Sequence, residues 1–404
     1  MPEYDSNMHI ILFEDHLRSA FLPLAYTRPI GDLRFGIYTL ADQWDGLLRP
    51  TAISHATNTT LQQAYPTQYG AENLLINARL IPDALLANEL SQLELGTMLS
   101  AQDGVVIAYK ANREQAEKWI LSAERQSNND SIENEYNLLT HITDLFQKND
   151  TAIDTEFKRL SYQRISAPLS PTVTVIGDPS RVFMEEGASV EGCWLNTTKG
   201  NIYIGKDATI MEGCVVHGPL GLCHNSTIKA GAKIYGATTI GPHSKVGGEV
   251  SNSVIQGYSN KGHDGFLGNS IIGEWCNLGA DTNTSNLKNN YSDVRLWNYN
   301  NQSYQPSGLT FCGLIMGDHS KSSINSMFNT GTVVGVNANI FGSGFPPKHI
   351  PSYSWGGSEG FDTYDFDKSV EVAKRVMARR NVELSEAQIS ILRQIYSDSA
   401  HFRD

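Results

Sequence analysis

The most regular pattern in this chain is an aliphatic residue at every sixth position across residues 204–246. These positions are Ile204, Ile210, Val216, Leu222, Ile228, Ile234, Ile240 and Val246. Four residues after each comes a second set, most of them small: Ala208, Cys214, Leu220, Ser226, Ala232, Thr238, Ser244 and Val250. A period of six fits neither a helix nor a flat strand. It is typical of a parallel β-helix, in which each hexad supplies one short strand and one turn.

Less regular repeats extend this solenoid in both directions. It is expected to begin near Ile176-Gly177. A later set comprises Met316, Ser322, Phe328, Val334 and Ile340. Two segments, Ser251–Asp264 and Asn286–Gly308, break the pattern and are predicted to leave the solenoid as excursions. Such loops commonly build the binding sites of solenoid proteins.

The part of the chain before residue 165 alternates between strand and helix patterns instead. The expected strands are Ile10–Phe13, Leu74–Ile76 and Val105–Tyr109. The expected helices are Ile37–Leu48, Pro82–Leu93 and a helix capped by Asn112 that runs to about Arg125. Alternation of this kind predicts an α/β domain with a parallel, layered sheet.

Composition changes along the chain suggest its domain boundaries. The expected segments are an α/β domain at 1–165, a linker at 166–175, the β-helix at 176–350 and a helical cap at 351–404. Pro168 and Pro171 mark the linker. Ser385 and Gln388 have the spacing of a capping box that opens the last helix. We expect the terminal helices to cover the open end of the solenoid, where strand edges would otherwise be unpaired.

Charge and cysteine content narrow the function classes. The chain has 31 Lys and Arg against 43 Asp and Glu, a net charge of −12, which argues against a nucleic-acid surface. No apolar run is long enough for a membrane span, and Met1–Asp15 does not resemble a signal peptide. The five cysteines form no C-x-x-C pair, which indicates reduced thiols and a cytoplasmic protein.

A run of motifs in the solenoid resembles one known family. The motifs are Gly262-His263-Asp264-Gly265-Phe266-Leu267-Gly268, Ile272-Gly273, Asn277-Leu278-Gly279-Ala280 and Thr284-Ser285-Asn286. They resemble the acyltransferase half of GlmU, the bifunctional N-acetylglucosamine-1-phosphate uridylyltransferase and glucosamine-1-phosphate acetyltransferase family. The resemblance implies a left-handed parallel β-helix after a nucleotidyltransferase-like domain. A prism-shaped solenoid also packs naturally around a three-fold axis, so a homotrimer is expected.

The resemblance also implies roles for individual residues. His263 matches the family's general base, which removes a proton from the acceptor amine as that amine attacks the thioester of acetyl-CoA or another acyl-CoA. Asn277 and Ala280 match positions that contact the sugar and the coenzyme, and Asn286 matches the asparagine of an Asn-Tyr motif. Lys261 lies close by in sequence and is a candidate substrate ligand; the alternative is a solvated loop lysine. The histidines lack zinc-site spacing, so no metal is expected in the solenoid.

The N-terminal part resembles sugar nucleotidyltransferases through Phe21–Pro29 and Phe35-Gly36. The family's Gly-rich phosphate loop corresponds to Glu14–Ser19, which has no glycine, and Arg18 matches its arginine. Arg79 stands where the family has a Mg²⁺-binding aspartate, so Mg²⁺ in this domain is in question.

Three further charged residues of this region are Arg28, Asp32 and Arg34. They are candidates for a cluster that binds a sugar phosphate. The alternative is a set of surface ion pairs.

Taken together, the patterns predict an acyl-CoA-dependent acyltransferase acting on an amino sugar phosphate or a nucleotide sugar. One alternative adds nucleotidyl transfer, giving a bifunctional enzyme of nucleotide-sugar biosynthesis. Another is a non-catalytic trimeric protein that binds sugar phosphates or acts as a scaffold, because a fold does not by itself determine a function.

Overall fold

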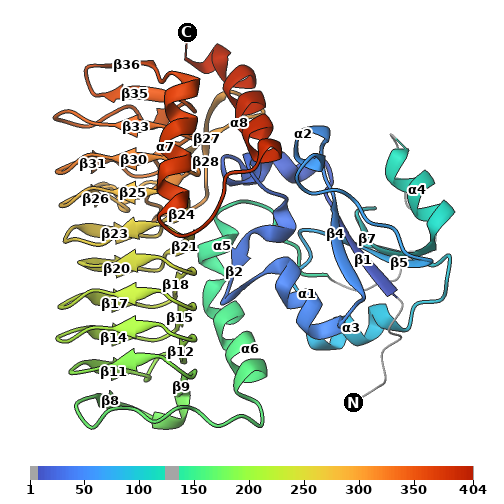
Figure 1. Ribbon diagram of the computed structural model, residues 1–404, viewed down its shortest axis with the longest axis horizontal. Coiled ribbons are helices and arrows are strands. Elements are labelled where there is room, and N and C mark those ends of the chain that lie inside the picture. Colours follow the sequence, from blue (N-terminus) through green and yellow to red (C-terminus); the bar gives the residue numbers. More distant parts are fainter. Residues whose placement is uncertain (1–7, 123–135, 404) are drawn as a thin grey trace. The chain divides into compact units, whose positions relative to one another are not determined.

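The computed structural model describes residues 8–122 and 136–403 (Figure 1). The chain divides into two compact units. The N-terminal unit comprises Met1–Phe21, Thr27–Leu33 and Tyr38–Ile142, and the solenoid unit comprises Leu22–Tyr26, Arg34–Ile37 and Thr143–Asp404. The last change of unit falls between Ile142 and Thr143, which is earlier in the chain than the expected linker.

A mixed sheet forms the core of the N-terminal unit. Its strands lie in the order β4 (Ala52–Ala56), β1 (Met8–Phe13), β5 (Glu72–Asn77), β7 (Val106–Asn112) and β6 (Met98–Ser100). β1 is parallel to β4 and β5, but β7 runs antiparallel to both of its neighbours, so the expectation of a parallel sheet is wrong at this edge. The reason is the short link from Ala101 to Val105, which is enough for a hairpin and too short for a parallel crossover.

The helices of this unit begin at polar caps. They are α1 (Leu40–Leu48), α2 (Thr59–Gln62), α3 (Ala84–Ser91) and α4 (Arg113–Leu121), and the short strand β3 (Tyr38–Thr39) precedes α1. Asn112 caps α4 as predicted, in a capping box with Gln115 that satisfies backbone N–H groups of the first turn. Trp119 on the inner face of α4 packs edge-on against Phe13 of β1, with ring centroids 4.8 Å apart.

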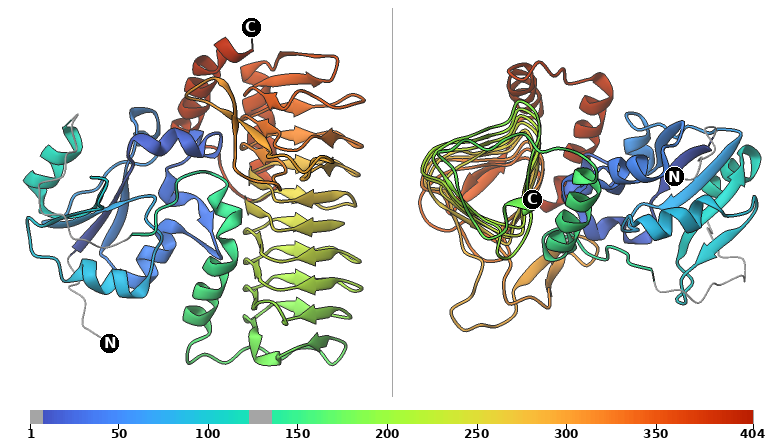
Figure 2. Two further views of the ribbon diagram at one scale, coloured as in Figure 1. Left: turned by 180° about the vertical axis from the view of Figure 1, so that it is seen from behind. Right: turned by 90° about the horizontal axis from the view of Figure 1, so that it is seen from below.

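The solenoid unit is a parallel β-helix, which confirms the main prediction from the hexads. Leu220 pairs with Ile202 and Thr238 pairs with Leu220, so successive strands of one face are 18 positions apart and one coil consists of three hexads. Seen end-on, with the coils stacked behind one another, the solenoid has a triangular outline (Figure 2). The helices α5 (Asp144–Gln147) and α6 (Asn149–Ser161) also belong to this unit.

Short strands stack into the faces of the prism. The first face contains β10 (Ser189–Val190), β13 (Thr209–Ile210), β16 (Thr227–Ile228), β19 (Lys245–Val246), β22 (Asn260–Lys261), β25 (Asn277–Leu278), β30 (Lys321–Ser322), β33 (Asn339–Ile340), β35 (Ser354–Gly357) and β36 (Gly360–Thr363). The second contains β8 (Thr174–Ile176), β11 (Trp194–Asn196), β14 (Val215–His217), β17 (Lys233–Tyr235), β20 (Glu249–Ser251) and β23 (Phe266–Gly268), with the pair β26 (Asn283–Thr284) and β31 (Met327–Phe328). The third contains β9 (Val182–Met184), β12 (Ile202–Ile204), β15 (Leu220–Leu222), β18 (Thr238–Ile240), β21 (Val254–Gly257), β24 (Ile271–Glu274), β29 (Ile315–Met316), β32 (Val333–Val334) and β34 (His349–Ile350).

The hexad aliphatic residues fill the interior of the prism. All of those predicted from Ile204 to Val246 are buried and belong to one continuous core. Full burial of such a side chain contributes about 1.5–3 kcal/mol. The repeated placement of one such residue per hexad therefore stabilises every coil in the same way, as in other repeat proteins.

One of the two predicted excursions is wrong. Residues 251–264 do not leave the solenoid, because they supply the paired strands β21 and β22. Ile240 pairs with Ile255 and Val246 pairs with Lys261, only 15 positions apart. A shortened coil thus hides the six-residue period in the sequence while keeping the strands in register.

The second excursion is confirmed. Residues between β26 and β29 include an antiparallel hairpin, β27 (Arg295–Asn298) with β28 (Ser303–Pro306). After the last coils, β36 pairs antiparallel with β35 and covers its edge.

The terminal helices are α7 (Phe366–Ala378) and α8 (Glu386–Asp398), with the predicted capping box at Ser385. They lie along the side of the later coils instead of across the end of the solenoid (Figure 1). In the described residues, no helix combines the length and the apolar character needed to cross a lipid bilayer.

Candidate functional site

A cleft of about 740 Å³ lies on the first face of the solenoid, beside the C-terminal end of α7. Three of the residues predicted from the sequence line it: His263, Asn277 and Ala280. They come from successive coils, because Asn277 on β25 pairs with Asn260 on β22. Stacking of the coils thus brings together residues that are up to 17 positions apart in the sequence.

The His263 side chain is exposed to the cleft and does not enter the packed interior. It lies two residues after the end of β22, in the loop that leads to β23. Within the described part of the chain, no hydrogen bond to its imidazole is found. Both ring nitrogens are therefore available to a bound molecule, which a general base requires.

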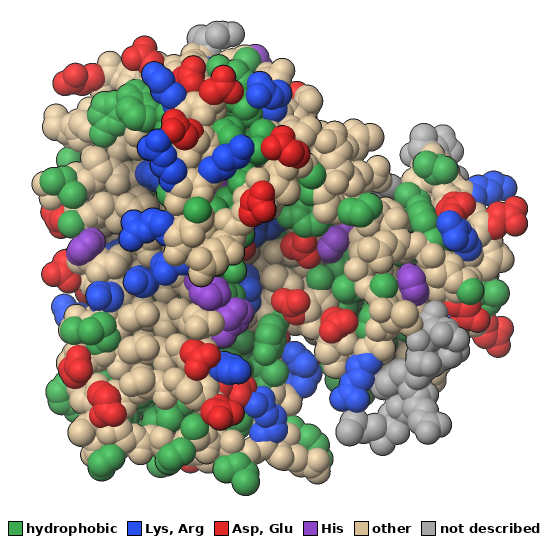
Figure 3. All heavy atoms as spheres, viewed as in Figure 1, with side chains coloured by type: hydrophobic (Ala, Val, Ile, Leu, Met, Phe, Trp, Pro, Cys, Tyr) green, Lys and Arg blue, Asp and Glu red, His purple; other side chains and the backbone are tan. Residues whose placement is uncertain are grey.

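Cations dominate the lining of this cleft. Of the described residues, those that carry positive charge into the lining are Lys229, Lys245, Lys321, Arg379 and Arg380, and the described lining contains no carboxylate. Figure 3 shows Lys and Arg side chains gathered across the middle coils of the solenoid. Because the chain as a whole has a net charge of −12, this concentration of positive charge indicates a site for an anionic ligand.

Sequence reasoning missed these cations. Lys229 and Lys245 could have been found, since each lies on or just after a strand of the same outward-facing stack. Arg379 and Arg380 could not, because only the packing of α7 against the coils brings them to the cleft.

A ladder of four stacked rings contributes two of its members, Tyr258 and Trp275, to the lining of the cleft. His243, Tyr258, Trp275 and His319 stack at one corner of the prism, with centroid distances of 4.8, 4.2 and 6.4 Å along the series. Each has a left-handed backbone, with φ between 52° and 61°. That conformation costs roughly 1–2 kcal/mol for a residue with a Cβ, so packing of the stacked rings must offset it.

Lys261 has a different position from the one expected. Its partner in the neighbouring coil is the core residue Val246, and its side chain points into the prism with only 3% of its surface exposed. The ammonium donates hydrogen bonds to the carbonyl oxygens of Gly247 at 2.9 Å and His263 at 2.8 Å. It is neither a solvated loop lysine nor a residue of the cleft lining; it ties the backbone of His263 to the preceding coil.

Burial lowers the pKa of Lys261 to about 8, although Asp264 and Asp281 oppose the shift. The unfolded chain keeps this proton up to its ordinary pKa of 10.5. Between these values the unfolded state binds more protons, so stability rises with pH. We therefore expect Lys261→Met to remove a stability gain of a few kcal/mol between pH 8 and 10.5.

Urea unfolding of wild type and Lys261→Met at about pH 7.5, 9 and 10 measures this effect. Lys206→Met, which changes an exposed lysine, is the matched control. The difference from wild type is expected to change with pH for Lys261→Met and to stay constant for Lys206→Met. A constant difference for both variants would contradict the lowered pKa.

Asn286 does not join the cleft. Its side-chain amide donates to the Asn269 side chain at 2.8 Å, and it is not among the residues that line the cleft.

A second pocket of about 650 Å³ lies in the N-terminal unit. Its lining includes Phe13–Asp15, Ala56–Asn58 and Asn77, which follow or end the parallel strands β1, β4 and β5. Open α/β sheets bind their ligands at this carboxyl edge. Arg18 also lines the pocket, and its guanidinium pairs with Glu14 at 3.0 Å.

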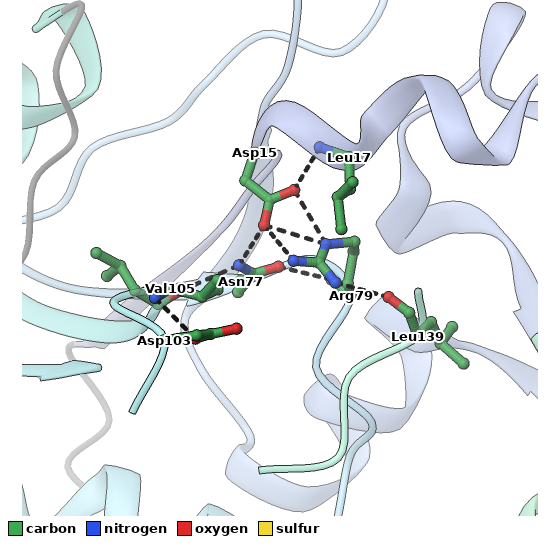
Figure 4. A network of polar contacts seen from close by, with 8 residues as sticks. Asp15, Leu17, Asn77, Arg79, Asp103, Val105 and Leu139 are labelled. Atoms are coloured by element: carbon green, nitrogen blue, oxygen red, sulfur yellow. Dashed lines mark hydrogen bonds and ion pairs between the residues drawn. The ribbon is translucent and has the colours of Figure 1, made fainter. Parts of the chain in front are cut away.

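Asp15, which lines this pocket, forms an ion pair with Arg79 (Figure 4). Arg79 donates from Nε to both oxygens of Asp15 at 3.0 and 3.1 Å, and from Nη2 to Oδ2 at 2.5 Å. Asn77 adds a hydrogen bond to Asp15 at 3.0 Å. Burial raises the pKa of Asp15, but these bonds from Arg79 and Asn77 outweigh it and hold the pKa below its usual value.

The candidates Arg28, Asp32 and Arg34 fall in different units of the chain. Arg34 belongs to the solenoid unit, where it is buried and its Nε donates to the Gln256 carbonyl at 2.9 Å. Arg28 and Asp32 belong to the N-terminal unit, and Asp32 pairs with His55 at 3.0 Å. The sequence could not show this division, because Asp32 and Arg34 are separated by a single residue.

Comparison with known proteins supports the resemblance for parts of the chain. Residues 10–165 match the family model described as sugar nucleotidyl transferase. The chain is 36% identical over 104 residues to the bifunctional protein GlmU of Methanocaldococcus jannaschii, covering 26% of this chain and 25% of that protein. It is 30% identical over 145 residues to a bifunctional sugar-1-phosphate nucleotidylyltransferase/acetyltransferase of Sulfurisphaera tokodaii, covering 35% and 36%.

A GlmU protein of Herminiimonas arsenicoxydans is 25% identical over 182 residues, which cover 36% of this chain and 37% of that protein. The matched parts of the chain are thus similar to GlmU proteins. The chain nevertheless matches well under two thirds of the length of these relatives. Among solved structures, an Arabidopsis UDP-N-acetylglucosamine acyltransferase is similar over 53% of this chain and 80% of that chain, with 14% identity and a TM-score of 0.25.

Proposed function

We propose that the solenoid cleft transfers an acyl group from acyl-CoA to an amino or hydroxyl group of a sugar phosphate or nucleotide sugar. The observation that carries this proposal is the position of an exposed imidazole, His263, in a cleft whose charged side chains are cationic. Both expected substrates are phosphate-bearing anions, and Lys and Arg are the residues that bind phosphate. Asn277 adds an amide that can donate to or accept from a sugar hydroxyl.

The chemistry follows from the free imidazole. The acceptor nitrogen or oxygen attacks the thioester carbonyl carbon while His263 takes its proton, since a neutral imidazole is a suitable base near pH 7. The tetrahedral intermediate then collapses, the carbon–sulfur bond breaks, and CoA leaves as a thiolate that recovers the proton from the imidazolium. Ala280, a small residue in the lining, leaves room for the pantetheine arm.

The wider setting is also a proposal. A homotrimer would place a neighbouring chain against the faces of the prism, and a cytoplasmic location agrees with the free cysteines Cys193, Cys214, Cys223, Cys276 and Cys312. The domain limits 1–165, 166–175, 176–350 and 351–404 stay predictions. A bifunctional enzyme is the second candidate, favoured by the family match over residues 10–165.

Binding of CoA tests the proposal directly. Isothermal titration of the whole protein with CoA and acetyl-CoA is expected to show binding that weakens from about 50 to 200 mM salt, because surface charges are screened. Replacing Arg379 and Arg380 together by glutamine should weaken binding about tenfold or more for each charged hydrogen bond that the substitution removes.

Arg375→Gln is the matched control. Arg375 lies on the same helix α7, pairs with Glu371, and is not part of the cleft lining. Equal CoA binding by the double variant and by Arg375→Gln would contradict this location for the coenzyme. No binding of CoA or acetyl-CoA to the wild-type protein would contradict the acyltransferase function.

A further inference from the structure

The Asp15 carboxylate, which lines the N-terminal pocket, accepts hydrogen bonds from the protein on both of its oxygens. Asp15 lies just after β1, at the sheet edge where a ligand would bind. One carboxylate oxygen accepts from the backbone N–H of Leu17 at 3.0 Å and from Arg79. The other accepts from Asn77 at 3.0 Å and from Arg79.

Arg79 is buried, and its guanidinium is fixed by hydrogen bonds to the protein. Only 1% of its surface is exposed. In addition to its bonds to Asp15, its Nη1 donates to the carbonyl oxygen of Leu139 at 2.7 Å. The guanidinium is always charged and its donors have a fixed planar geometry. A permanent positive charge therefore faces Asp15 from within the fold.

These residues do not fit a Mg²⁺ ion. Mg²⁺ requires oxygen ligands in a near-octahedral arrangement, whereas both oxygens of Asp15 accept from protein donors. Within residues 8–122 and 136–403, no group of three or more His, Cys, Asp or Glu side chains is arranged to hold a metal. Arg79 cannot act as a ligand, since it has donors only.

The same residues also oppose a triphosphate. Backbone N–H groups of an open loop are the usual cradle for phosphates. Here the N–H of Leu17 is bonded to the Asp15 carboxylate and that of Arg18 to the Asp15 carbonyl at 3.2 Å. Asp103 adds a further carboxylate to the pocket lining, which would repel phosphate groups. Glu14 also lines the pocket, where its carboxylate pairs with Arg18.

We infer that Arg79 is a built-in cation that takes the place of a metal ion at Asp15, and that the N-terminal pocket does not bind a magnesium nucleoside triphosphate. The Asp15 carboxylate accepts the hydrogen bond from the Leu17 N–H that a phosphate would otherwise accept. Arg79 supplies the positive charge that balances this carboxylate. The pocket then serves a phosphate-free ligand or portion of a ligand. This inference is independent of acyl transfer in the solenoid cleft, and it argues against the bifunctional enzyme given above as the second candidate.

Metal binding tests the inference with Mn²⁺, a paramagnetic substitute for Mg²⁺. Arg79→Asp sets a second carboxylate beside Asp15, so we expect ~1 mM Mn²⁺ to raise its melting temperature by several degrees and to leave wild type unchanged. Electron paramagnetic resonance of free Mn²⁺ provides a second measurement of binding. If Arg79→Asp does not fold, Arg79→Asn frees Asp15 without adding charge and is expected to bind Mn²⁺ more weakly.

Two results would overturn the inference. One is Mn²⁺ binding to wild type that disappears in Asp15→Asn, since the carboxylate would then already hold a metal. The other is a folded Arg79→Asp or Arg79→Asn variant with no gain of Mn²⁺ binding, since Arg79 would then not be what excludes the ion.

Nucleotide binding separates the metal from the phosphate. UTP and uridine are titrated into wild type with and without Mn²⁺. We expect UTP to bind no more tightly than uridine and Mn²⁺ to change neither, and an absence of UTP binding also agrees with the inference. Tighter binding of UTP in the presence of Mn²⁺ would overturn it.

Discussion

Replacing His263 by alanine should lower the rate of acyl transfer by about 10²–10⁴-fold, the usual contribution of a general base. The loss is expected in kcat, with little change in the KM for acyl-CoA, because the cations of the cleft remain. The fold should be unaffected. The side chain is exposed, and exposed substitutions away from special features usually change stability by less than about 0.5 kcal/mol.

The measurement is release of free CoA from acetyl-CoA in the presence of an amino sugar phosphate such as glucosamine 1-phosphate. His401→Ala is a suitable control, because His401 is also exposed and lies in the short helix Ala400–Phe402, outside the cleft lining. It should retain wild-type activity. Normal turnover by His263→Ala would show that another group removes the proton, even if CoA still binds in the cleft.

The second large effect is expected from the buried ion pair of the N-terminal unit. Arg79→Leu should lower the free energy of unfolding of this unit by about 3–5 kcal/mol, because it leaves the Asp15 carboxylate without its charged partner in a largely buried place. Hydrogen exchange of the amides in β1 and β5 reports the stability of this unit separately from the solenoid.

The double variant Asp15→Asn/Arg79→Leu is the control for this effect. It removes both charges, so its loss should be clearly smaller than that of Arg79→Leu alone. Equal losses would show that Arg79 acts through packing and not through its charge.

Acid should weaken the same ion pair in the wild-type protein. The pKa of Asp15 is held below its ordinary value of 3.8 by the bonds from Arg79 and Asn77. Its contribution is therefore complete above that value and is lost as the pH falls through the lower pKa of the folded state. The stability difference between wild type and Asp15→Asn should accordingly shrink in strong acid.

Much of the solenoid could be predicted from its sequence because the same structural requirement returns in every hexad. Each of the aliphatic positions from Ile204 to Val246 faces the same interior, so a single rule accounts for all of them. The prediction failed at the coil that ends with Lys261, where three residues fewer complete the turn. Periodicity cannot reveal a shortened coil, since the pairing that proves it lies between strands.

Some site residues could likewise be predicted from the repeat, whereas others are brought to their site only by tertiary packing. His263, Asn277 and Ala280 lie within one stretch of the repeat, so their meeting in the cleft follows from coil stacking. Arg379 and Arg380 reach the same cleft through the packing of α7, and the bonds of Arg79 to Asp15 join residues 64 positions apart. Contacts of this kind depend on tertiary structure, and no local sequence pattern predicts them.

The interior lysine has a consequence for how the coils find their neighbours. Near-identical coils could pair one step out of place at little cost, because each exchanges one aliphatic residue for another. Lys261 removes that degeneracy. A slip by one coil would carry its ammonium away from the Gly247 carbonyl and leave the buried charge with the His263 carbonyl alone of its two acceptors, a loss of about 1.5–3 kcal/mol. A single polar residue in the apolar interior of the solenoid can thus fix the register of the stacked coils.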